Sequence, residues 1–172
     1  MLSLIINADD FGLTRGVNQA VVELAKRGAL SSTSVMVNQP YAEEAAELLE
    51  LPNFSVGLHC NLTEGAPVSP AETISSLVNE NGLFFSQREF RRRLSKKQIT
   101  VEDMVTELSA QFDRLSSILN GRVSHLDSHQ NIHKAWGVAD AFLTLATQHP
   151  KLGVRAPARY IYRENVGPVP SL

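Results

Sequence analysis

Two adjacent carboxylates follow the first apolar run of the chain. Asp9 and Asp10 stand in the stretch NADDFG, directly after LSLII. Like charges side by side repel each other, so this placement has a cost. Either one aspartate caps the next helix while the other points to water, or the pair is held there for chemistry.

Imidazole and carboxylate groups gather again further along the chain. His59 closes the run FSVGLHC. The segment SHLDSHQNIH supplies four more candidates: His125, Asp127, His129 and His133. One carboxylate and two imidazoles, with coordination positions left open for water, form a set that binds a catalytic divalent cation. We therefore predict that Asp10, His59 and His129 ligate a metal ion.

Asp9 then becomes an unliganded carboxylate beside the cation and its water. That is the location a general base requires, and the cation offsets the repulsion between the two aspartates. Each group taken alone also has a plain structural reading, as turn residues for the aspartates or as a hydrogen-bonded histidine for His59. Their joint occurrence at three strand ends favours the metal site.

Strand and helix patterns alternate along the chain and predict how these groups are positioned. Continuous apolar or β-branched runs predict strands at 2–8, 32–38, 54–60, 122–129 and 152–157. Helical periodicity between start and stop signals predicts helices at 14–28, 40–52, 100–121 and 134–148. The short connections indicate parallel βαβ units, in an open sheet or a barrel. Functional groups in such folds collect at the carboxyl ends of the strands.

Residues 61–100 break the alternation. They contain scattered prolines, an NENG turn and the basic stretch REFRRRLSKK, with one short helix expected at about 86–94. We interpret the basic stretch as a solvated helix face, with a lid over a ligand as the second reading, since long ordered loops are usually functional. Trp136 is expected in the core, with stacking on a ring as its alternative role.

Bulk properties restrict the class of protein. At 172 residues the chain fits one domain, 1–172, and its formal net charge of −2 gives no electrostatic reason to bind nucleic acid or an anionic membrane. No apolar run has the ~20 residues of a membrane-spanning helix. The start lacks a basic region and a signal-length apolar run, and the single cysteine, Cys60, fits a reducing compartment. We expect a cytoplasmic location.

With these residues identified, the sequence resembles the YdjC-like carbohydrate deacetylase family, which includes chito-oligosaccharide deacetylases. INADDFGLTRGVNQAV, STSVMVN, VGLHCNLTEG and SHLDSHQNIH stand in the family's order and spacing, across essentially the whole chain. The resemblance implies a distorted TIM-barrel-like (β/α) barrel that removes acetyl groups from N-acetylated sugars and oligosaccharides. By matching position, Asp9 resembles the catalytic base. Asp10, His59 and His129 resemble the metal ligands, with Mg²⁺ or Zn²⁺ as the usual ion.

The chain departs from the family pattern in one respect. Family members are longer and carry a further histidine, in a His-Pro motif near a late strand, that resembles the general acid. This chain ends at VGPVPSL without it, and His149-Pro150 lies too early, after a helix. We therefore expect a domain that lacks its C-terminal part, with an unclosed barrel whose exposed strand edges favour a homo-oligomer such as a dimer.

Four residues have weaker expected roles. His125 or Asp127 is a possible substitute for the general acid, and His133, one helical turn from His129, is a possible second support or substrate contact. Arg155 is placed to orient Asp9 through an ion pair. Another metal-dependent hydrolase, such as a phosphoesterase or amidohydrolase, and a non-catalytic remnant that binds sugar or metal are the alternative functions.

Overall fold

The computed structural model describes residues 4–155, which form one parallel sheet and the helices around it. The strands are β1 (Asn7–Phe11), β2 (Ser32–Val35), β3 (Ser55–Cys60), β4 (His125–Ser128) and β5 (Gly153–Val154). The α-helices are α1 (Arg15–Lys26), α2 (Gln87–Ser95), α3 (Val101–Ile118) and α4 (Val138–Gln148). Three 3-10 segments complete the elements: η1 (Ala42–Glu50), η2 (Ala71–Ile74) and η3 (His129–Lys134).

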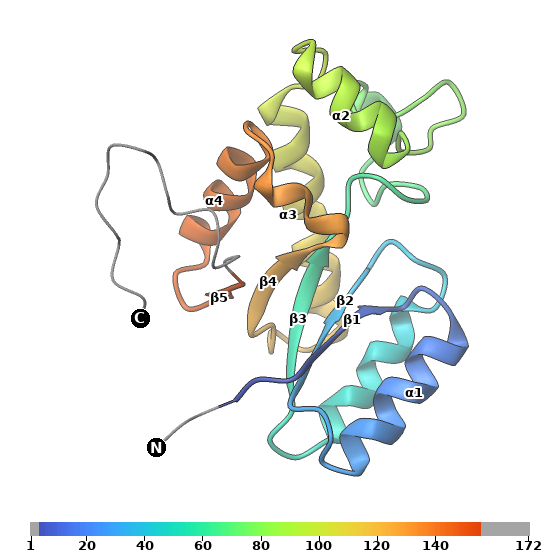
Figure 1. The fold of residues 1–172 in the computed structure, drawn as a ribbon, viewed down its shortest axis with the longest axis vertical. Coiled ribbons are helices and arrows are strands. Elements are labelled where there is room, and N and C mark those ends of the chain that lie inside the picture. The colour runs from blue at the N-terminus through green and yellow to red at the C-terminus, as the bar shows by residue number, and fades with distance from the viewer. Residues whose placement is uncertain (1–3, 156–172) are drawn as a thin grey trace.

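Each strand of the sheet pairs in parallel with the next strand in the sequence, in the order β1-β2-β3-β4-β5. This is the strand order of a (β/α) barrel, and the predicted α/β class with a parallel sheet is confirmed. The long segment between β3 and β4 leaves the sheet and carries α2, which lies at the opposite end of the molecule from α1 (Figure 1).

The two faces of the sheet differ in chemistry. Val35, Leu58 and Leu126 are fully buried on one face, within a core that helices α1, α3 and α4 also line. Residues that alternate with them face the other side, where His59 and Asp127 are register partners on β3 and β4. Strand alternation therefore places polar groups on one face and the core on the other.

Two sequence expectations on the first strand and on Trp136 need correction. The first strand begins only at Asn7, where pairing with Ser32 starts, so Leu4 and Ile5 precede the sheet and are 79% and 77% exposed. Trp136 is 77% exposed rather than in the core.

Two predicted helices are shorter or tighter than their patterns indicate. Segment 40–52 forms the 3-10 helix η1, and the helix predicted at 134–148 begins only at Val138. The delay follows from the extended backbone at Ala135 and the positive φ of Gly137, which prevent a continuous helix from 134 onward. Across residues 4–155, no helix combines the length and apolar character needed to cross a membrane.

Candidate metal centre

A bulge in β1 brings two consecutive aspartates to one side of the sheet. Consecutive strand residues normally point to opposite faces. In β1, however, the three steps from Ala8 to Phe11 match only two steps on β2, so one residue is extra. Asp10 adopts a left-handed backbone with φ of 65°, which aspartate tolerates better than most residues. The bulge re-aims the side chains, so that Asp9 and Asp10 both approach the polar face.

The turn after the aspartates is fixed by a buried side chain of α1. Asn18 is 2% exposed, and its Oδ1 accepts a hydrogen bond of 2.7 Å from the Gly12 N–H. Gly12 has φ of 98°, and a Cβ there would lie 3.0 Å from the Met36 carbonyl oxygen. A side chain at position 12 would therefore push β1 away from β2, which explains the glycine that follows the pair.

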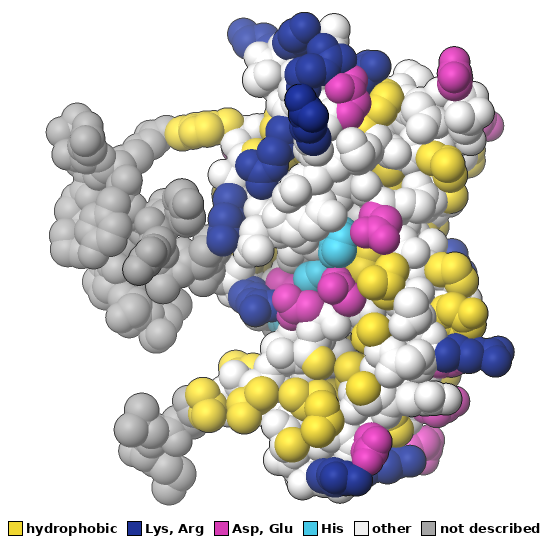
Figure 2. Space-filling model, turned by 45° about the vertical axis from the view of Figure 1, so that its right-hand side comes forward, with side chains coloured by type: hydrophobic (Ala, Val, Ile, Leu, Met, Phe, Trp, Pro, Cys, Tyr) yellow, Lys and Arg dark blue, Asp and Glu magenta, His cyan; other side chains and the backbone are white. Residues whose placement is uncertain are grey.

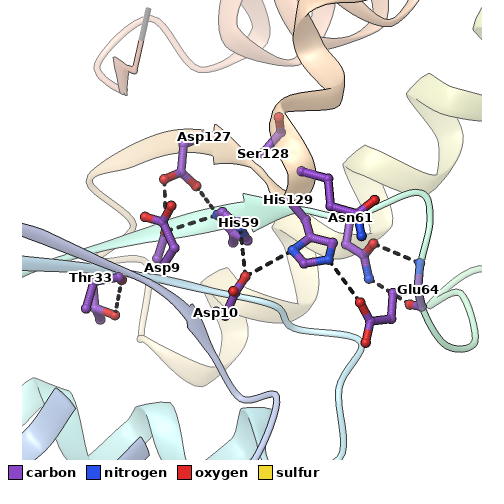
Figure 3. A network of polar contacts seen from close by, with 12 residues as sticks. Asp9, Asp10, Thr33, His59, Asn61, Glu64, Asp127, Ser128 and His129 are labelled. Atoms are coloured by element: carbon purple, nitrogen blue, oxygen red, sulfur yellow. Dashed lines mark hydrogen bonds and ion pairs between the residues drawn. The ribbon is translucent and has the colours of Figure 1, made fainter. Parts of the chain in front are cut away.

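Asp10, His59 and His129 converge from three strand ends. Asp10 Oδ1 lies 3.1 Å from His59 Nε2 and 3.0 Å from His129 Nδ1 (Figure 3). Metal–ligand bonds of 2.0–2.2 Å place neighbouring ligand atoms about 2.8–3.6 Å apart, from octahedral to tetrahedral geometry. The three groups form a possible metal-binding triad of one aspartate and two histidines, and their spacing fits a single cation.

His59 is held by a buried carboxylate on the neighbouring strand. Its Nδ1–H donates to Asp127 Oδ1 over 2.6 Å, and the two residues are 2% and 1% exposed. Ser34 donates to the other oxygen of Asp127 over 2.9 Å. Because Nδ1 is engaged with a carboxylate, Nε2 is the nitrogen that faces Asp10 and a cation.

The cluster is strongly polarised in the metal-free protein. Hydrogen bonds from His129 and His59 hold the pKa of Asp10 well below its usual range. Burial lowers the pKa of His59, but the contacts with Asp10 and Asp127 outweigh burial and raise it to about 9. His59 is therefore a charged imidazolium at neutral pH, at a position where a divalent cation would replace its Nε2 proton.

Asp9 lies beside this triad and is held by one of its two oxygens. Asn7 Nδ2 and Arg155 Nη1 donate to Asp9 Oδ1 over 2.8 and 2.6 Å. Asp9 Oδ2 has no hydrogen-bond partner among residues 4–155. Arg155 also donates to Asp127 over 3.0 Å, so one cation bridges both carboxylates.

A second group, Asp9, His59 and Asp127, is also close enough to hold a metal ion. In that group the positive charge is already supplied by Arg155, whose guanidinium contacts both aspartates. We therefore favour the triad that contains Asp10 and His129.

Two of the predicted histidines do not join the cluster. The ring of His125 lies across Gly57, where a Cβ would meet His125 Nε2 at 2.4 Å, and burial lowers its pKa. His133 bonds the Ser128 hydroxyl, its ring stacks on Phe142 with centroids 5.2 Å apart, and burial lowers its pKa too. Among the described residues, no hydrogen bond, ion pair or ring contact joins His133 to His129, and its role as a second support or substrate contact stays a prediction.

Glu64 is the member of the cluster that sequence reasoning missed. Its Oε2 lies 3.0 Å from His129 Nε2, on the far side of the ring from Asp10. The signal was present in VGLHCNLTEG, where an acidic residue follows His59 by five positions at the start of the long excursion. Side chains of Asp10 and Glu64 are 36% and 44% exposed, so the cluster opens to solvent. Figure 2 shows histidine and acidic side chains together in the middle of one face.

Comparisons with known proteins show which family this chain resembles. The YdjC-like protein family matches residues 3–168. A carbohydrate deacetylase of Thermoanaerobacter pseudethanolicus is 41% identical, over 87% of this chain and 58% of its own length. A chitooligosaccharide deacetylase of Proteus mirabilis is 37% identical, over 76% of this chain and 49% of its own length.

A solved structure has the same fold. It comes from Enterococcus faecalis, is named as a candidate cellobiose-phosphate cleavage protein, and superposes with a TM-score of 0.80 at 34% identity. The match covers 91% of this chain and 59% of the other. The chain thus spans about half to three fifths of the length of these relatives.

Proposed function

This chain belongs to the YdjC-like family, and from that premise we propose that it acts as a metal-dependent carbohydrate deacetylase. The reaction is hydrolysis of the acetamido group of N-acetylated sugars or oligosaccharides of the chito-oligosaccharide type. The observation that carries the proposal is the convergence of Asp10, His59 and His129, with Asp9 beside them. Relatives that share this sequence at 41% and 37% identity are named as deacetylases of carbohydrate and chitooligosaccharide.

The residues divide the work between binding and proton transfer. Asp10, His59 and His129 would hold a divalent cation, either Mg²⁺ or Zn²⁺, which when bound would supply Lewis-acid polarisation and a more acidic water. Asp9 accepts the proton of the attacking water through Oδ2, because Asn7 and Arg155 occupy Oδ1. Arg155 keeps this carboxylate oriented and also donates a hydrogen bond to Asp127, the carboxylate that holds His59.

Electrostatics argue against both sequence candidates for the general acid. Burial disfavours charge on Asp127, but hydrogen bonds from His59, Ser34 and Arg155 lower its pKa overall, so it is a poor proton donor. Burial lowers the pKa of His125, which is therefore neutral at pH 7.

Acetate release tests this proposal. The chain, supplied with Mg²⁺ or Zn²⁺, should release acetate from acetylated chito-oligosaccharides, and Asp9→Asn should slow release by about 10²–10⁴-fold while metal stays bound. Asp113→Asn, an exposed change on α3, should leave the rate unchanged. Metal binding without acetate release from the parent chain would instead indicate a non-catalytic remnant.

Cleavage of a phosphorylated disaccharide is the second candidate, because the superposed Enterococcus faecalis structure carries that name. The same ligands suit phosphate esters and other amides. Parallel assays should therefore follow phosphate and free sugar from cellobiose phosphate. Release of these products without acetate from chito-oligosaccharides would reject the deacetylase proposal.

A cytoplasmic location and a homo-oligomeric state, such as a dimer, remain predictions from the sequence. Cell fractionation tests the first. Light scattering coupled to size exclusion tests the second.

A further inference from the structure

We propose that Glu64 is a positioning residue that decides which ring nitrogen of His129 faces the cation; the proposal rests on the metal centre described above. His129 lies between two carboxylates, with Nδ1 3.0 Å from Asp10 Oδ1 and Nε2 3.0 Å from Glu64 Oε2. An ionised carboxylate only accepts hydrogen bonds, so Glu64 keeps a proton on Nε2. A neutral imidazole with its proton on Nε2 has its lone pair on Nδ1, toward Asp10.

Glu64 thereby fixes the orientation of the His129 ring, as Asp127 fixes the ring of His59. In each case a carboxylate binds the ring nitrogen that points away from Asp10. Such partners of metal-bound histidines fix the tautomer and the ring orientation. The arrangement gives both histidines of the triad a defined donor atom, and Figure 3 shows the two supports on opposite sides of the cluster.

The backbone of Glu64 is fixed by side-chain amides. Asn61 Oδ1 accepts from the N–H groups of Thr63 and Glu64 over 3.0 and 3.1 Å. The Glu64 carbonyl accepts from Asn38, Gln39 and Asn61 over 3.0, 3.1 and 2.7 Å. These contacts hold the main chain from which the Glu64 side chain reaches His129.

Helix α3 anchors both ends of the same loop. Gln111 exchanges two hydrogen bonds with the main chain of Asn61, over 3.1 and 2.6 Å. Glu107 is fully buried and accepts from the N–H groups of Val68 and Ser69, both over 2.9 Å. The loop from 61 to 69 is therefore held as a rigid support that presents Glu64 to His129.

Zinc affinity, measured by calorimetry with Zn²⁺ alone, tests the proposal. Glu64→Ala should weaken binding about 10–100-fold, the usual cost of losing such a partner. Glu64→Gln should recover most of the affinity, because its amide oxygen still accepts from Nε2–H. Glu72→Ala removes the same charge from an exposed position on η2 and should change nothing.

A His129→Ala variant separates failure of this proposal from failure of the metal centre. If His129→Ala binds Zn²⁺ like the parent chain, the centre itself is wrong. If His129→Ala loses affinity while Glu64→Ala keeps it, only the role of Glu64 is overturned.

Nitrogen-15 spectra of the histidine rings in the zinc-bound parent chain provide a readout that needs no substitution. We expect Zn²⁺ on Nδ1 of His129 and a proton on Nε2. Zinc bound through Nε2 would contradict the proposal even if the Glu64 variants failed to fold.

Discussion

The two histidines of the centre are supported by carboxylates in very different surroundings. His59 and Asp127 are register partners on adjacent parallel strands, and both are almost completely buried. His129 is supported from a loop by Glu64, whose side chain is 44% exposed. A carboxylate that binds the outer ring nitrogen of a histidine thus occurs once within the sheet and once at the surface.

Because Asp127 is buried and Glu64 is exposed, we expect their removal to affect protein stability and metal binding differently. Removing one partner of a buried charge pair leaves the other charge uncompensated, whereas an exposed pair is screened by water. Asp127, on the strand, should therefore contribute both to the stability of the fold and to metal binding. Glu64, on the loop, should contribute to metal binding with little effect on stability.

The largest expected effect comes from breaking the buried pair. Asp127→Ala leaves His59 and Arg155 without their shared carboxylate, and it should lower the free energy of unfolding by about 3–5 kcal/mol. Glu64→Ala should lower it by less than about 1 kcal/mol. Urea denaturation of the metal-free proteins measures both values, and equal losses in the two variants would remove the proposed distinction.

Alkaline pH should also lower stability, by removing the proton of His59 and with it the attraction to Asp127 and Asp10. The folded pKa of His59, about 9, lies above the ordinary value of 6.5, so its stabilisation is complete below pH 6.5 and is lost as pH rises through 9. The loss is on the order of 3 kcal/mol. Urea midpoints of the chelator-treated chain across this window test the expectation. His59→Gln should lack the pH-dependent loss, and a parallel decline in both proteins would contradict the assignment.

A third expected effect probes the anchor of the loop. Glu107→Ala leaves the N–H groups of Val68 and Ser69 unpaired, at a cost of about 1–3 kcal/mol in unfolding free energy for each N–H group that stays buried. It should also weaken zinc binding, because Glu64 loses its rigid support. In a double-mutant cycle, Glu107→Ala should cost little further affinity once Glu64→Ala is present. Fully additive losses would show that the anchor acts independently of Glu64.

The sheet side of the site was largely predictable from the sequence. Alternation of strand and helix patterns indicated parallel βαβ units, and such units place strand-end residues on one edge. His59, His129 and the aspartate pair were identified in this way. Regular alternation nevertheless predicts that Asp9 and Asp10 point to opposite faces. The bulge that brings them together depends on pairing with β2, which no local pattern encodes.

The loop side was not predictable for a related reason. Glu64 and His129 are 65 residues apart in sequence, and their contact depends on anchors from α3 that periodicity does not reveal. The apolar residues Leu4 and Ile5 were predicted as a covered strand but lie exposed before the sheet. In both cases tertiary pairing decided the outcome, and local pattern did not.

The central claim is that Asp10, His59 and His129 bind one cation together. Elemental analysis of the chain purified without added metal, and of its three single alanine variants, tests this directly. We predict about one divalent cation per parent chain, its loss in each of the three variants, and its retention in Asp9→Asn. A full complement of metal in His59→Ala and His129→Ala would contradict the account.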